Sequence, residues 1–178
     1  MSLSSTAIHA LTTTQIASLS TTAIRAFDAT ELSYFTTTEI GALATTQVSA
    51  LSTSQVSSLT TSFLRTLDTT QISSLTATQF GALASTQVAG LETTDVAVLS
   101  TTQIGALSVS SLGALTGSLA AALTTTIVSA LSTTQIAGFT TSQLNALGAT
   151  NIAVLSTTNV AALTPTQIRG LTADQIVG

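Results

Sequence analysis

Side chains that act as nucleophiles or bases are unevenly represented in this chain. Ser and Thr hydroxyls occur throughout, but a hydroxyl attacks a substrate only when a neighbouring base accepts its proton. The chain has one histidine, His9, and no cysteine, and no serine lies in a Gly-x-Ser-x-Gly turn. We therefore predict that the chain is not an enzyme and has no catalytic residue.

Metal-binding and cofactor-binding patterns are missing as well. A single histidine cannot form the His and Cys sets that hold zinc, and the sequence has no glycine-rich loop of the kind that binds phosphate. Glu31 and Glu39 lie eight residues apart, and we expect both to be solvated residues at helix starts. We predict no metal site, no cofactor-binding residue and no cofactor.

Charge and hydropathy limit the partners of the chain. Charged residues make up 6% of the sequence and the net charge is −4, so there is no basic surface for nucleic acid. Mean hydropathy is +0.58, but Ser and Thr interrupt every apolar run before it reaches the length of about 18 residues that spans a membrane. We predict no nucleic-acid partner and no membrane insertion.

One eight-residue unit, or octad, repeats twenty-two times from Leu3 to Gly178 without insertion or deletion. We label its positions a to h, with Leu3 at a. Position a is Leu or Phe in every octad, and f is Ile, Val, Leu or Phe in all except the one with Ala120. Position h is mostly Ala, Gly or Ser, which predicts that the backbone approaches a neighbour closely there. Such units stack into a solenoid, because no unit can bury its own apolar face.

Positions b to e of the octad form a helix start. Position b is Ser, Thr or Asp in eighteen octads and e is Gln or Glu in thirteen, the two residues of a capping box. In the octad 163–170, Thr164 is the cap, Pro165 the first helical residue and Gln167 the third. A continuous helix would rotate the apolar stripe by about 80° per octad. We therefore predict an all-α solenoid over 3–178 as one domain, with one helix of one to one and a half turns per octad.

Charged residues, which did not define the register, test this prediction. All seven acids fall at b, d or e: Asp28, Glu31, Glu39, Asp68, Glu92, Asp95 and Asp174. All three arginines and the histidine fall at g: His9, Arg25, Arg65 and Arg169. A helix dipole favours this separation. A β-solenoid is the alternative, because Thr, Val and Ile favour strands; however, positions a and f would then lie on opposite faces of a strand.

Two departures from this regularity bear on function. Residues 107–130 carry Ser111, Leu119 and Ile127 at e and Ala120 at f, while Phe63 is an isolated apolar residue at e. Residues 107–130 have either lost the repeat pattern or form a hinge or apolar patch for self-association. Position d is Ser or Thr in twenty-one octads. We expect these hydroxyls to bond to backbone in the turn or to the neighbouring unit; alternatively, they form an exposed ladder.

Octads 131–138 (LSTTQIAG) and 99–106 (LSTTQIGA) resemble the Thr/Gln-rich octapeptide arrays of very large bacterial surface and secreted proteins, often called adhesin-like. The resemblance covers the whole chain and carries over no binding or catalytic residue. It implies a structural spacer or stalk, located outside the cell or at its surface, that is a piece of a longer array. The alternative is a binding module whose Ser/Thr ladder contacts ice, a glycan or another repeating surface.

Overall fold

The computed structural model describes residues 4–177, and all regular secondary structure in that range is helical. The all-α solenoid prediction is confirmed, and the β-solenoid alternative is not, because no strand occurs among these residues. The helices are α1 (Ser5–His9), α2 (Thr13–Ser18), α3 (Thr21–Ala26), α4 (Ala29–Ser33), α5 (Thr37–Gly41), α6 (Thr45–Ala50), α7 (Thr53–Ser58), α8 (Thr61–Leu64), α9 (Thr69–Ser74), α10 (Ala77–Gly81), α11 (Ser85–Ala89), α12 (Thr93–Ala97), α13 (Thr101–Ala106), α14 (Val109–Gly113), α15 (Gly117–Ala121), α16 (Thr125–Ser129), α17 (Thr133–Ala137), α18 (Thr141–Ala153), α19 (Thr157–Ala161), α20 (Pro165–Arg169) and α21 (Ala173–Val177).

Every one of these helices begins at position c, behind a cap at position b. In α10, Gln79 N–H donates to Thr76 Oγ1 at 3.2 Å, and Thr76 N–H donates to Gln79 Oε1 at 2.7 Å. Where b is alanine only the second bond forms, as from Ala44 N–H to Gln47 Oε1 at 2.7 Å. The predicted capping box therefore sets the start of the helices.

Helix α18 is longer than the others because it runs through two octads. Gly148, at position b, has φ +76° and ψ 168°, the one positive φ in the described range. An L-residue with a side chain rarely adopts this conformation, whereas glycine does so readily. The turn between these two octads therefore differs from the others and depends on glycine.

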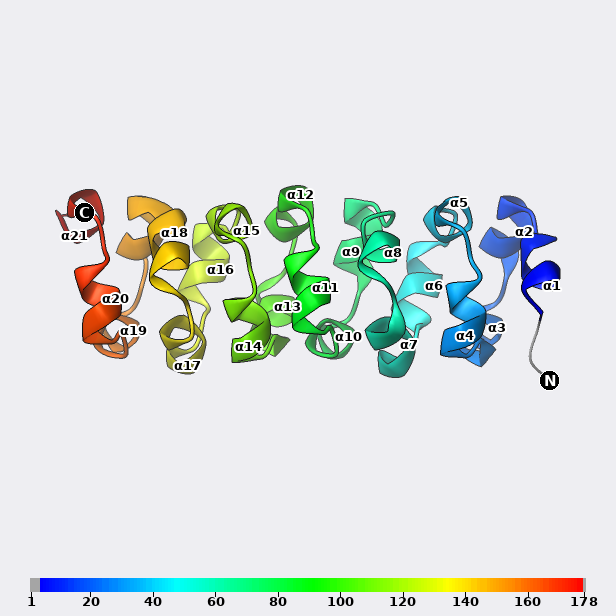
Figure 1. The fold of residues 1–178 in the computed structure, drawn as a ribbon, viewed down its shortest axis with the longest axis horizontal. Coiled ribbons are helices and arrows are strands. Elements are labelled where there is room, and N and C mark those ends of the chain that lie inside the picture. Colours follow the sequence, from blue (N-terminus) through cyan, green and yellow to red (C-terminus); the bar gives the residue numbers. More distant parts are fainter. Residues whose placement is uncertain (1–3, 178) are drawn as a thin grey trace.

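The octads wind into a coil in which each helix packs against the helix three octads further along, as α4 does on α7 and α7 on α10. Successive coils follow one another along a single axis, and the N- and C-terminal ends of the chain lie at opposite ends of the resulting rod (Figure 1). Each coil is therefore in contact with the coil before it and the coil after it.

The core runs the length of the rod and is built mainly from positions a and f, joined by the apolar e residues Phe63, Leu119 and Ile127. Ile16 and Phe80, both at f, are completely buried, and Leu75 at a is 2% exposed. The f side chains of the last coil, such as Val160 and Ile168, are each 45% exposed because no later described coil covers them. Position f is thus buried by stacking, as expected for a solenoid.

The apolar residues of 107–130 lie in the core. Leu119 is 3% exposed, Ala120 0% and Ile127 2%, and Val109 is the one large apolar side chain of this segment on the described surface. The expected apolar patch is therefore absent, because stacking buries the residues that would form it. Self-association through 107–130 therefore has no such patch to support it and stays a prediction.

Positions g and h are where successive coils approach most closely. A Cβ atom on Gly90, at h, would lie 1.8 Å from Thr61 Cγ2 of the preceding coil. A Cβ atom on Gly81, at g, would lie 2.9 Å from the carbonyl oxygen of Ala106 in the following coil. The close approach of the backbone to a neighbour predicted at position h is confirmed, and at Gly90 that neighbour is the side chain of Thr61.

Candidate functional site

The glutamines at position e cap their own helices and also bind the preceding coil. Gln79, which is 2% exposed, directs its amide nitrogen at the end of α6. Its Nε2 lies 3.0 Å from the carbonyl oxygen of Val48, 3.3 Å from that of Ser49 and 2.7 Å from that of Leu51. One amide group thus bonds to three carbonyls at the end of α6, of which that of Val48 also accepts a bond from Leu51 N–H. We call this contact the amide bridge.

The amide bridge recurs along the rod. The glutamines that form it are Gln47, Gln55, Gln71, Gln79, Gln87, Gln103, Gln135, Gln143, Gln167 and Gln175. The shorter Asn151 and Asn159 each reach one carbonyl, that of Leu123 at 2.8 Å and that of Leu131 at 3.0 Å. Gln15, in the first coil, makes only the bonds of its capping box. The amide bridge therefore requires a preceding coil.

The sequence contains a signal for the amide bridge that the capping interpretation missed. Glutamine fills position e in eleven octads and glutamate in two, although both residues serve a capping box. Only glutamine adds an N–H donor beyond the oxygen that the box uses. The excess of glutamine reflects a contact between coils that lie 28 to 31 residues apart in sequence.

Carboxylates replace the amide at three e positions. Glu31, Glu39 and Asp95 are 5%, 7% and 4% exposed, so the expectation that Glu31 and Glu39 are solvated is wrong. Glu39 Oε2 accepts a bond from Thr36 N–H at 2.6 Å, as a glutamine oxygen would. Burial raises the pKa of Asp95 above its ordinary value; the hydrogen bond from the Glu92 N–H opposes this rise, and the Glu92 charge adds to it.

The basic side chains at position g bind the following coil. Arg65 Nε donates to the carbonyl oxygen of Gly90 at 2.9 Å, and Arg25 makes the equivalent bond 25 residues ahead. His9 is exposed, and its Nε2 lies 2.6 Å from the carbonyl oxygen of Tyr34, also 25 residues ahead. Beyond the dipole effect that predicted their position, these side chains connect coils.

The hydroxyls at position d lie on the surface. Every d residue of the described range is exposed. In five octads the d hydroxyl bonds to the cap serine two residues earlier: Ser52 with Ser54, Ser100 with Thr102, Ser108 with Ser110, Ser132 with Thr134 and Ser156 with Thr158. The expectation that they bond to backbone is wrong, because the helix directs them away from the rod.

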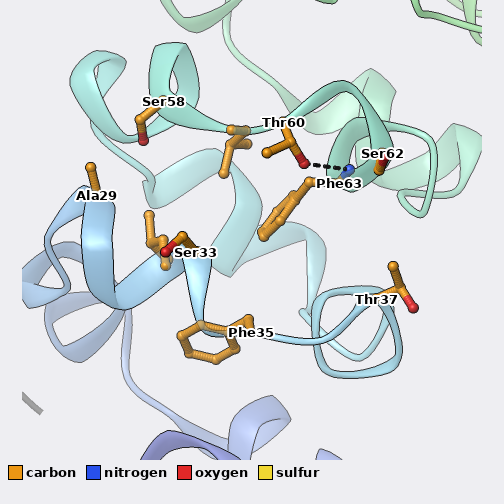
Figure 2. Close-up of a pocket in the computed structure, with 10 residues that line it drawn as sticks. Ala29, Ser33, Phe35, Thr37, Ser58, Thr60, Ser62 and Phe63 are labelled. Atoms are coloured by element: carbon orange, nitrogen blue, oxygen red, sulfur yellow. Dashed lines mark hydrogen bonds between the residues drawn. The ribbon is translucent and has the colours of Figure 1, made fainter. Parts of the chain in front are cut away.

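A pocket of about 100 Å³ opens beside Phe63, which replaces glutamine at position e. Figure 2 shows Phe63 and Phe35 at the pocket, with the Phe63 N–H bonded to Thr60 Oγ1 at 3.2 Å. The remaining lining residues are Ala29, Leu32, Ser33, Thr37, Ser58, Leu59 and Ser62. None of these residues carries an acid or a base, so the pocket offers shape and apolar contact rather than acid–base chemistry.

Clusters that could hold a metal ion and helices that could span a membrane are both absent from residues 4–177. Residues 4–177 contain no group of three or more His, Asp or Glu side chains close enough to hold a metal ion. None of the helices in this range combines the length and the apolar character that crossing a membrane requires.

Comparison with known proteins supports a repeat region. A family model described as the ALTTAQ repeat matches residues 88–125 and 128–157. The first match includes Ser111 and Leu119, so octads that have lost the glutamine still belong to the repeat region. No curated protein and no solved structure matches the chain. The chain thus contains a structural repeat module.

Proposed function

We propose that this chain is a stiff, non-enzymatic spacer, which holds functional parts of a large bacterial surface or secreted protein away from their base. The amide bridge is the observation that carries this proposal. Ten glutamines and two asparagines each bond their octad to the preceding coil, and all twelve of these bonds are buried. Bending the rod would stretch these hydrogen bonds. Stretching them requires more free energy than it would in water, because a buried hydrogen bond is electrostatically stronger.

The location outside the cell rests on sequence features. The octads resemble those of adhesin-like surface and secreted proteins, and the ALTTAQ match supports a structural repeat. The absence of cysteine is compatible with export. A surface of hydroxyls with few charges is what a spacer needs, because it presents no strong field to a partner.

Small-angle X-ray scattering of the full chain tests the spacer. A stiff rod keeps the same maximum dimension when salt concentration is varied. A variant with Gln79→Ala and Gln135→Ala, which loses two amide bridges, is expected to bend and to shorten. Gln15→Ala is the matched control, because Gln15 has no preceding coil to bind. A wild-type dimension that changes with salt, or equal dimensions for all variants, contradicts the proposal.

Contact with a repeating surface is the second candidate function. The exposure of every described d residue favours it. Octads that stack on one another lie three apart, so Thr46, Thr70 and Thr94 belong to one side of the rod. A rigid coil holds such hydroxyls at a fixed spacing, which matches an ordered surface such as ice or a glycan.

Assays of ice recrystallisation and of glycan binding distinguish the two candidates. If the ladder binds, replacing Thr46, Thr70 and Thr94 together by alanine reduces the wild-type activity. Replacing Thr46, Ser54 and Ser62, which lie in consecutive octads on different sides of the coil, reduces it less. The absence of activity in the wild-type chain contradicts the second candidate and leaves the spacer unaffected.

A further inference from the structure

Asp95 occupies the place of an amide bridge. It is the third residue of α12, it is 4% exposed, and its Oδ2 accepts a bond from Glu92 N–H at 2.9 Å. Asn159, at the same position with a side chain of the same length, donates from Nδ2 to the carbonyl 28 residues earlier. The same offset from Asp95 leads to Leu67, in the turn before α9, and α12 packs on α9. No residue between 4 and 177 donates to the Leu67 carbonyl oxygen.

If Asp95 follows the offset of Asn159, its ionised carboxyl group faces the Leu67 carbonyl oxygen with two acceptors and no hydrogen between them. A carboxylate oxygen and a carbonyl oxygen repel each other, and at 4% exposure of Asp95 little water is available to bond to both. A protonated carboxyl group has one O–H donor and replaces the missing amide hydrogen. The proton therefore decides whether α12 is bonded to the preceding coil.

None of the charged groups near Asp95 in the described range forms an ion pair with its carboxylate. Glu92 lies on the same element and Asp68 caps α9, where its Oδ1 accepts a bond from Gln71 N–H. Arg65 is the nearby base, and its Nε is bonded to the Gly90 carbonyl oxygen. Helix α15, which also packs on α12, carries no titratable side chain. Burial raises the pKa of Asp95, in agreement with this arrangement.

We propose that Asp95 is a pH-sensitive latch between two coils: its protonated carboxyl group donates a hydrogen bond to the Leu67 carbonyl oxygen, and loss of the proton releases that contact. The latch goes beyond the spacer function and does not depend on it, since it concerns one junction of the fold. When Asp95 ionises, its proton passes to water.

The position of the latch gives it a larger effect than one bond. Of the five e residues from 95 to 127, only Gln103 forms an amide bridge, with Nε2 at 2.8 Å from the Leu75 carbonyl oxygen. Ser111 lies 3.5 Å from the Leu83 carbonyl oxygen, and Leu119 and Ile127 have no donor. When Asp95 is ionised, the amide bridge of Gln103 is therefore the main side-chain hydrogen bond between coils in this part of the rod. We expect the rod to bend here at high pH.

The direction of the pH effect follows from the raised pKa. A carboxyl group that holds its proton more tightly in the folded state contributes stability below its ordinary pKa, and this contribution is lost as pH rises through the raised pKa. Asp95→Asn supplies a donor at every pH. The ratio of the unfolding constants of wild type and Asp95→Asn is expected to rise by about tenfold per pH unit between the two pKa values.

Two measurements test the latch. Urea unfolding of wild type and Asp95→Asn from acid to neutral pH should show equal stability in acid and a more stable variant at neutral pH. Asp174→Asn, which removes an exposed acid from α21, should leave the pH dependence unchanged. Carbon-13 NMR of the wild-type carboxyl groups should show Asp95 titrating above the other aspartates. A stability difference that is constant with pH, or an ordinary titration of Asp95, overturns the proposal.

Discussion

The octads from 43 to 90 and the octads of 107–130 share one repeat but hold their coils together differently. In the first region Gln47, Gln55, Gln71, Gln79 and Gln87 each bond to carbonyls of the preceding coil. In the second, Leu119 and Ile127 fill the same positions and are equally buried, but they have no hydrogen to donate. In 107–130 the side chains at position e thus remain buried but no longer make a directional hydrogen bond to the preceding coil.

This difference separates two contributions to the rod. Apolar contacts are not directional, so they keep two coils together without fixing how one sits on the other. Hydrogen bonds to named carbonyls fix that arrangement, and they leave no buried acceptor without a donor. We therefore expect the octads of 107–130 to open before those of 43–90, which supports the hinge interpretation of this segment rather than the apolar patch.

The largest effect is expected from Gln79→Glu, which converts one amide bridge to a pair of facing acceptors. The variant keeps the capping oxygen but loses the donor to Val48 and Leu51, and buries a charge at neutral pH. We expect a loss of about 3 kcal/mol in the free energy of unfolding, measured with urea. Gln15→Glu keeps its capping box and has no preceding coil, so it should change stability by less than about 0.5 kcal/mol. Equal losses at both sites would show that capping, and not the amide bridge, matters.

Gly90→Ala tests how closely the coils of the first region approach. Its Cβ would lie 1.8 Å from Thr61 Cγ2, so one of the two must move. We expect destabilisation of about 1–3 kcal/mol, reduced when Thr61→Ser removes that methyl group. In residues 107–130, Gly117→Ala meets only Ala146 Cβ at 3.7 Å, an ordinary contact, and should be neutral or stabilising. Thermal unfolding of the four variants decides this; a neutral Gly90→Ala contradicts the close approach.

The smallest net effect is expected from Leu119→Gln, which restores the octad pattern in the second region. By the offsets of Gln79, its Nε2 reaches the carbonyls of Val88 and Leu91. The new bond and the lost apolar burial oppose each other, so net stability should change by less than about 1 kcal/mol. Local hydrogen exchange in α12 and α15 should slow by up to about fivefold. Leu119→Glu, without a donor, should speed exchange; slower exchange in both variants would contradict the amide explanation.

Much of the fold follows from residues that lie within one octad. Thr76 and Gln79 define a helix start by themselves, and Leu75 and Phe80 mark the core, because capping and apolar spacing act over a few residues. The destination of the Gln79 amide was not predictable in the same way. Its partners are 28 to 31 residues away, and capping alone gave a sufficient reason for glutamine.

The sequence by itself determined where each helix begins and which two positions supply most of the apolar core, since these depend on local hydrogen bonding and on apolar periodicity. Only the tertiary structure decided that octads stack three apart, that Glu39 and Asp95 are buried and that the d hydroxyls lie outside. The physical reason is that small rotations at each turn add up over a whole coil before two octads meet. This accumulated rotation decides whether a side chain faces water or a carbonyl of the neighbouring coil. It cannot be read from the sequence of a single octad.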